Sequence, residues 1–196
     1  GSQYYNQDID MPRIATMARR LQPGLIMVDR TVPGEYENYT TPEQEVPEKP
    51  LPYPWETCMT IGNSWSYNAA DQFKTSRMLV QTLIKVVSRG GNFLLNIAPG
   101  PDGDWNPLAY ERLADIGNWM KINSEGIYGS APCKPYSHDN IYFTQSVKQN
   151  RRYAFWLSEN DNVLLPEKVN IPLEGISAKV KQVQLMGTTV TINYVQ

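Results

Sequence analysis

Apolar residues in the first 126 positions follow two alternating patterns, one of helical spacing and one of short unbroken runs. Helical spacing predicts helices that begin after Asp10, at Ser76 and after Asn106. The unbroken runs lie at residues 25–28, 58–61 and 92–97. Parallel strands that are covered on both faces lose the alternation with polar residues, so these runs predict three buried parallel strands. The sequence therefore predicts a parallel α/β system in this part of the chain.

From Ile127 onwards the apolar period changes to two, which is typical of strands with one buried face. The segments with this period lie at residues 141–146, 153–157, 169–171, 180–185 and 190–194. Turn residues separate them. We therefore expect a small antiparallel sheet or sandwich over residues 131–196, after an α/β part over residues 1–130.

The segment 31–56 differs from its surroundings, because it holds six prolines and six glutamates. Such a density of proline excludes a helix or strand of useful length. Disordered segments avoid aromatic residues, yet this one carries three tyrosines and Trp55. We expect an ordered, functional loop, with a flexible linker as the alternative.

Composition removes several classes of function. A net charge of −2 over 196 residues argues against a nucleic-acid partner, because little positive charge is available to neutralise phosphates. No apolar run is long enough to predict a membrane span. Cys58 and Cys133 are far apart, and the single histidine, His138, lies in a polar turn, so no metal site, cofactor or histidine triad is expected.

In parallel α/β folds, ligands bind beyond the carboxyl ends of the strands. This rule selects Arg30, the stretch 62–68 and the stretch 96–103. The Arg30 guanidinium can clamp a substrate hydroxyl or carboxylate, or form a salt bridge with a nearby acid. Trp65 can anchor a core or offer an apolar wall to a sugar. A loop glutamate shielded by aromatic and proline surface can act as a general acid, although most such glutamates are simply solvated.

Two longer blocks carry a family resemblance. Residues 54–68 read PWETCMTIGNSWSYN and resemble the W-E-x-x-x-x-x-G-x-S-[FW]-G-Y-N stretch of the α-L-fucosidases of glycoside hydrolase family 29. Residues 83–103 resemble the family's L-V-D-V-V-S-K-G-G-N-L-L-L-N-I-G-P-x-x-D-G block, and residues 111–129 continue it. One departure is Ser66, where the family usually has glycine.

The resemblance implies a retaining glycoside hydrolase that releases α-L-fucose from fucosylated glycans. It also implies a fold, namely the C-terminal part of a (β/α)8-like barrel over residues 1–130, carrying loop 31–56, followed by a small antiparallel β-sandwich. Such enzymes use an aspartate nucleophile and a glutamate acid/base, with carboxyl groups about 5–5.5 Å apart. Many bacterial members of the family are periplasmic or secreted, which sets the expected location.

Three positions carry over from the family. Glu43 matches the catalytic acid/base, Arg30 matches the arginine that reaches the fucose, and Trp65 matches the aromatic residue against the fucose methyl group. Other glutamates close enough to compete for the acid/base role are Glu35, Glu37, Glu45 and Glu56.

The family's nucleophile lies in a W-[FL]-D-G strand end before the helix that begins after Asp10, and no such segment occurs here. A complete barrel typically takes about 250 residues. We therefore expect the nucleophile upstream of this chain, on a missing N-terminal barrel half in the same or another polypeptide, and no measurable hydrolysis by these 196 residues alone. The alternative is a non-catalytic carbohydrate-binding or interaction fragment. A third interpretation is an unrelated glycosidase that uses Asp29 with Glu43.

Overall fold

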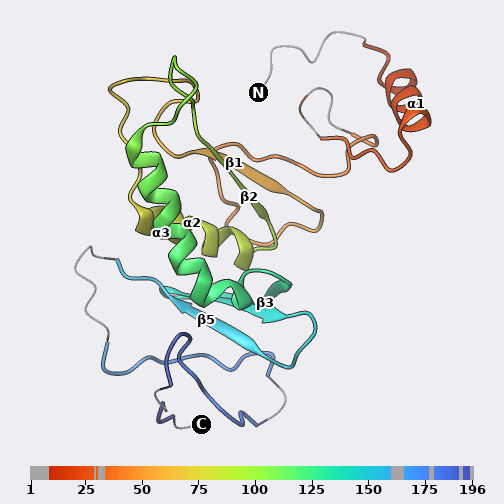
Figure 1. The fold of residues 1–196 in the computed structure, drawn as a ribbon. Coiled ribbons are helices and arrows are strands. Elements are labelled where there is room, and N and C mark those ends of the chain that lie inside the picture. Colours follow the sequence, from red (N-terminus) through yellow and green to blue (C-terminus); the bar gives the residue numbers. More distant parts are fainter. Residues whose placement is uncertain are drawn as a thin grey trace.

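The computed structural model describes residues 9–28, 30, 34–159, 166–176, 179–189 and 192–194. Its elements follow one another along the chain as shown in Figure 1. They are α1 (Met11–Leu21), β1 (Glu56–Thr60), α2 (Ser76–Ser88), β2 (Asn92–Asn96), α3 (Pro107–Asn123), the 3-10 turn η1 (Ser124–Gly126), β3 (Ser130–His138), β4 (Ile141–Ser146) and β5 (Arg152–Trp156).

Strands β1 and β2 pair in parallel, from Glu56 opposite Asn92 to Thr60 opposite Asn96. Helix α2 forms the crossover between them, so the predicted strand–helix–strand unit is confirmed. The Thr75 hydroxyl accepts a hydrogen bond from the Met78 amide and caps α2. All three predicted helices occur and begin at the expected positions, α1 after Asp10, α2 at Ser76 and α3 after Asn106.

A further extended segment lies beside β1, inside the loop that was expected to contain no strand. Isolated parallel bridges join Val28 to Tyr39, Thr40 to Trp55, and Glu43 to Cys58. The order of neighbouring parallel segments is thus Val28, residues 39–43, β1 and β2. The predicted strand at residues 25–28 is reduced to the bridge at Val28, because the Met27 amide donates to the side-chain oxygen of Asn38 and not to a strand carbonyl.

The C-terminal part forms a three-stranded antiparallel sheet in the order β3–β4–β5. The sequence did not predict strand β3, because Pro132 and Pro135 are unusual within a strand. The register of its pairing with β4 shifts between Pro132 and Ser137. The strands expected at 169–171 and 180–185 were wrong. Their apolar residues stay exposed, with Val169 at 42% and Leu185 at 50%. These side chains do not pack against a neighbouring layer that would stabilise paired strands.

The remaining expected strand, at 190–194, lies partly outside the described residues, and its described residues 192–194 form no strand. The division at residue 130 and a second sheet that would complete a sandwich stay predictions.

Three clusters of buried side chains hold the described elements together. Ile61, Leu79 and Ala109 join the end of β1 to α2 and α3. Ile84, Ile127 and Leu157 join α2 to the antiparallel sheet. The third cluster lies within that sheet and contains Cys133, Ile141 and Phe143. The helices therefore pack against both sheets and fix the loops at the carboxyl ends of β1 and β2.

Two faces are less covered than the sequence predicts. Leu94 on β2 is 45% exposed, although the apolar run had predicted cover on both faces. On α1, Ala15 is buried, but Ile14, Met17 and Leu21 remain exposed. Asp10 occupies the N-cap of α1 without a capping side-chain hydrogen bond. None of the helices in the described part is long and apolar enough to cross a membrane.

Candidate functional site

The candidate site lies where the parallel segments end. Arg30 follows the bridge residue Val28, and Glu43 ends the extended segment 39–43. The loop 61–75 leaves β1, and the loop 97–106 leaves β2. Figure 1 shows these last two loops running together at one end of the β1–β2 pair. This is the end that the strand-end rule selects for ligand binding.

Arg30 and Glu43 contact each other directly. The Arg30 Nη1 atom donates to Glu43 Oε2 at 2.5 Å, and Nη2 donates to the Cys58 sulfur at 2.7 Å. Hydrogen bonding to Glu43 raises the pKa of Arg30, so the guanidinium stays charged. The Gln44 amide donates to the Cys58 carbonyl at 2.9 Å and holds the Glu43 segment against β1. Side chains of Arg30 and Glu43 are 43% and 46% exposed, so both can reach a ligand.

The competing glutamates occupy other surroundings. Glu56 lies at the amino end of β1, opposite Asn92, and so at the far end of the strand from the site. Glu37 accepts from the Gly34 amide. Within the described residues, Glu43 is the glutamate that forms an ion pair with Arg30. Asp29, the partner in the third interpretation, is outside the described residues.

Trp65 lies on the neighbouring loop. Its carbonyl accepts a hydrogen bond from Asn96 Nδ2 at 3.1 Å, which ties the loop after β1 to the end of β2. The Trp65 side chain is 42% exposed. In the part of the chain that the structure describes, no hydrogen bond or ring contact links this side chain to Arg30 or Glu43. The structure therefore places Trp65 at the same end of the sheet without joining it to the pair.

Asp71 fixes the loop that carries Trp65, and sequence reasoning missed it. Its carboxylate accepts from the backbone amides of Asn63 at 2.9 Å and Ser64 at 3.3 Å. The close approach depends on Gly62, because a Cβ at this position would lie 2.1 Å from Asp71 Oδ2. Only the glycine of the G-x-S motif signalled this contact in the sequence.

Lys74 ties the end of the same loop back to its beginning. Its Nζ donates to the carbonyls of Thr60 and Gly62, both at 2.7 Å. Burial lowers the pKa of Lys74, and the charge of Asp71 opposes that shift. The Gln44 side chain donates to the Thr60 hydroxyl at 3.1 Å, so the segment that carries Glu43 and the loop that carries Trp65 are anchored on the same end of β1.

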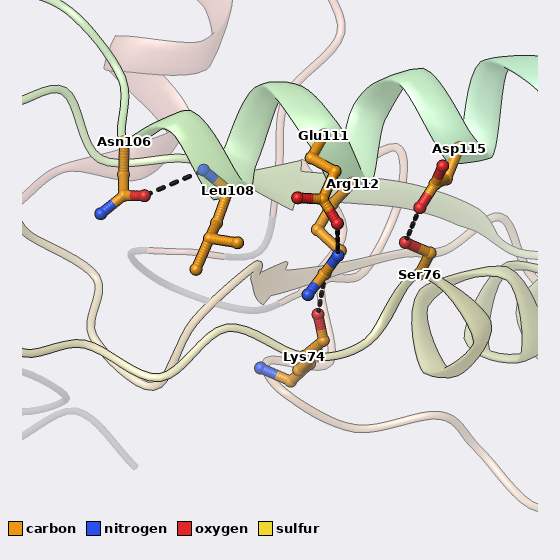
Figure 2. A network of polar contacts seen from close by, with 7 residues as sticks. All are labelled: Lys74, Ser76, Asn106, Leu108, Glu111, Arg112 and Asp115. Atoms are coloured by element: carbon orange, nitrogen blue, oxygen red, sulfur yellow. Dashed lines mark hydrogen bonds and ion pairs between the residues drawn. The ribbon is translucent and has the colours of Figure 1, made fainter. Parts of the chain in front are cut away.

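Helix α3 anchors this loop from the other side (Figure 2). Arg112 Nε donates to the Lys74 carbonyl at 3.1 Å, while Glu111 pairs with the same guanidinium at 2.6 Å. One turn further along, the Ser76 hydroxyl donates to Asp115 at 2.5 Å. The start of α2 and the second and third turns of α3 therefore brace the segment that leads back from the Trp65 loop.

Carboxylate, guanidinium and indole groups set the chemistry available here. Among the described residues, no group of three histidine, cysteine, aspartate or glutamate side chains could hold a metal ion. His138 is at the surface, with its side chain 52% exposed, as the sequence had indicated. A carboxyl group can take up and release protons, and a guanidinium can donate hydrogen bonds to sugar hydroxyls.

Comparisons with known proteins converge on one family. A family model described as Alpha-L-fucosidase matches residues 1–125. An alpha-L-fucosidase of Dictyostelium discoideum is 36% identical over 131 residues, which cover 65% of this chain and 28% of that protein. Plasma alpha-L-fucosidase of Homo sapiens is 35% identical over 126 residues, covering 61% and 27% respectively.

Solved structures agree with the sequence matches. Alpha-L-fucosidase isoenzyme 1 from Paenibacillus thiaminolyticus superposes with a TM-score of 0.65 at 30% identity, covering 68% of this chain and 35% of that one. The matched part of this chain thus spans 27% to 35% of the length of these relatives.

Proposed function

This chain belongs to the alpha-L-fucosidase family, and from that membership we propose that it carries the acid/base side of an active site that releases α-L-fucose from glycans. The observation that carries the proposal is the contact between Arg30 and Glu43 at the ends of neighbouring parallel segments. Both residues also stand at the positions that the family resemblance selects.

In this proposal Glu43 acts twice. It first protonates the glycosidic oxygen as the aglycone leaves, and it then removes a proton from the water that hydrolyses the fucosyl-enzyme. The side chain is 46% exposed, so water and a glycan can both reach it. Its backbone is held by the bridge to Cys58, which limits the positions that the carboxyl group can take.

Arg30 serves fucose recognition by exchanging partners. Without substrate, its two terminal nitrogens are bonded to Glu43 and to Cys58. A guanidinium has five N–H donors in a fixed plane. A sugar hydroxyl can therefore replace Glu43 as the acceptor of the Arg30 Nη1 hydrogen bond, while the bond to Cys58 keeps the guanidinium in place. This exchange releases the Glu43 carboxyl group for proton transfer.

Trp65 supplies an apolar wall against the fucose methyl group. The wall stays in place because Asp71, Lys74 and Asn96 hold its loop through backbone groups. An indole presents a large rigid surface at little cost in conformational entropy, which suits it to this position.

A retaining mechanism needs a second carboxyl group about 5–5.5 Å from Glu43. In the described part of the chain, no aspartate is hydrogen-bonded or ion-paired to Arg30 or Glu43. We place the nucleophile on residues outside these 196, within a barrel half that covers the exposed Leu94 face of β2. In that assembly residues 1–130 are part of a (β/α)8-like barrel and residues 131–196 a β-sandwich. The enzyme is exported to the periplasm or the medium.

The test uses the complete enzyme that carries this chain. The Glu43→Gln variant is expected to lose about 10²–10⁴-fold in kcat on a fucosylated disaccharide, the usual contribution of general acid–base catalysis. On an aryl fucoside whose leaving group needs no protonation, azide is expected to restore turnover of this variant, because azide attacks the fucosyl-enzyme without a general base. Glu45→Gln is the matched control, two residues further along the same segment. Full activity in Glu43→Gln, or an equal loss in Glu45→Gln, would refute the assignment of Glu43 as the acid/base.

A further inference from the structure

A second group of aromatic side chains lies at the same end of the sheet as the candidate site, and the fucose site does not use it. Trp105 and Tyr110 are 38% and 49% exposed, and their ring centroids lie 5.4 Å apart at a tilt of 40°. Trp105 ends the loop that leaves β2, and Tyr110 stands in the first turn of α3. Together these two rings are here named the aromatic platform.

The platform is held in place before any ligand arrives. Tyr110 donates its hydroxyl hydrogen to Asp104 Oδ1 at 2.9 Å, which fixes the ring beside Trp105. The loop before it is closed by backbone bonds from Gly100 to the Asp104 carbonyl and from Gly103 to the Gly100 carbonyl. A surface that needs no ordering on binding retains more of its interaction energy as affinity.

The platform also adjoins the loop of Trp65. A Cβ placed on Gly100 would lie 3.5 Å from a ring carbon of Tyr67, so the loop after β2 packs directly on the loop after β1. Tyr67 is 47% exposed and follows Trp65 by two residues. Tyr67 thus lies where the loop that carries Trp65 meets the loop that leads to the platform.

We propose that the aromatic platform binds the sugar to which fucose is attached, and so selects the aglycone; this rests on the proposed fucosidase function. The negative face of an aromatic ring attracts the polarised C–H groups of a pyranose. The exposed carboxylates of Asp102 and Asp104 stand at its edge and can accept hydrogen bonds from the sugar hydroxyls. Aromatic rings beside carboxylates match one face of a neutral sugar.

The test compares two substrates of the complete enzyme. Fucosyl fluoride has no second sugar, whereas a fucosylated trisaccharide presents two. The measured quantity is the ratio of kcat/KM for the trisaccharide to kcat/KM for the fluoride. Trp105→Ala is expected to lower this ratio about tenfold, the effect of losing one good stacking contact. Trp105→Phe keeps a ring and is expected to keep most of the ratio.

Two further variants make the result decisive. Tyr110→Ala removes the other half of the platform and is expected to lower the ratio in the same direction, which covers the case that Trp105→Ala fails to fold. Tyr53→Ala is the matched control, because Tyr53 is also 49% exposed but precedes β1 at its amino end. An active wild type whose ratio stays within about twofold in both platform variants would overturn the inference alone. A wild type inactive on both substrates would overturn the proposed function and this inference with it.

Discussion

Gly62 is the position where a single methyl group is expected to disturb the loop of Trp65. In Gly62→Ala the new Cβ would lie 2.1 Å from Asp71 Oδ2 and 2.7 Å from Asp71 Cγ, so the carboxylate must leave its place. Leaving breaks the hydrogen bonds from the Asn63 and Ser64 amides. Hydrogen bonds to a charged group contribute about 1.5–3 kcal/mol each, and solvent returns part of that at a half-exposed site. We therefore expect a loss of about 2 kcal/mol in the free energy of unfolding.

The reasoning is tested by a double-mutant cycle in urea unfolding. Asp71→Ala removes the same two hydrogen bonds and also the one that the Gln72 amide donates to Asp71 Oδ1, so it is expected to cost at least as much as Gly62→Ala. The double variant is expected to cost no more than Asp71→Ala alone, because the clash has lost its partner; the coupling energy is then about 2 kcal/mol. Two costs that simply add would refute the mechanism. Gly117→Ala is the control, since Gly117 lies inside α3 with open space around it and should gain about 0.5–1 kcal/mol.

The remaining predictions concern the core, acid stability and thiol access. Leu79→Ala empties a site that is 1% exposed and is expected to lower the free energy of unfolding by about 2–5 kcal/mol, measured in urea; a loss below 1 kcal/mol would contradict its place in the core. Hydrogen bonds from Tyr153 and Arg151 hold the pKa of Glu125 below its usual 4.5. Because the folded pKa is the lower one, this stabilisation is present above pH 4.5 and is lost as the pH falls through the folded value; Glu125→Gln should therefore flatten the acid limb of a plot of melting temperature against pH, and an unchanged slope would argue against it. Burial raises the pKa of the Cys133 thiol, while Cys58 is half-exposed beside the candidate site, so iodoacetamide should label Cys58 first in the native protein, as read by mass spectrometry; equal labelling rates would disprove the difference.

Local patterns predicted the helices well. The apolar spacing placed α2, and the spacing together with the cap at Asn106 placed α3, because both signals act within a few residues of one another. The run at β2 also predicted a strand correctly. Its expected cover on both faces did not follow, because cover depends on other elements, and Leu94 is 45% exposed.

Long-range pairing was predicted less well. Prolines concealed both the segment 39–43 and strand β3, since each is held by a partner strand rather than by its own propensity. Conversely, the period of two at 169–171 and 180–185 predicted strands that do not form. Alternating apolar side chains stabilise a strand only when another layer of the fold buries them.

The sequence by itself determined the family, the helices and the residues worth testing, because motif letters and apolar spacing are local properties of the chain. Only the tertiary structure brought Arg30 onto Glu43 and separated that pair from Glu56 at the other end of β1. It alone revealed that Asp71 and Lys74 hold the Trp65 loop, and that Trp105 lies against Tyr110. The contacts around the site join residues that lie up to 39 positions apart, as in the bond from Ser76 to Asp115, and such pairings are set by strand order and helix packing.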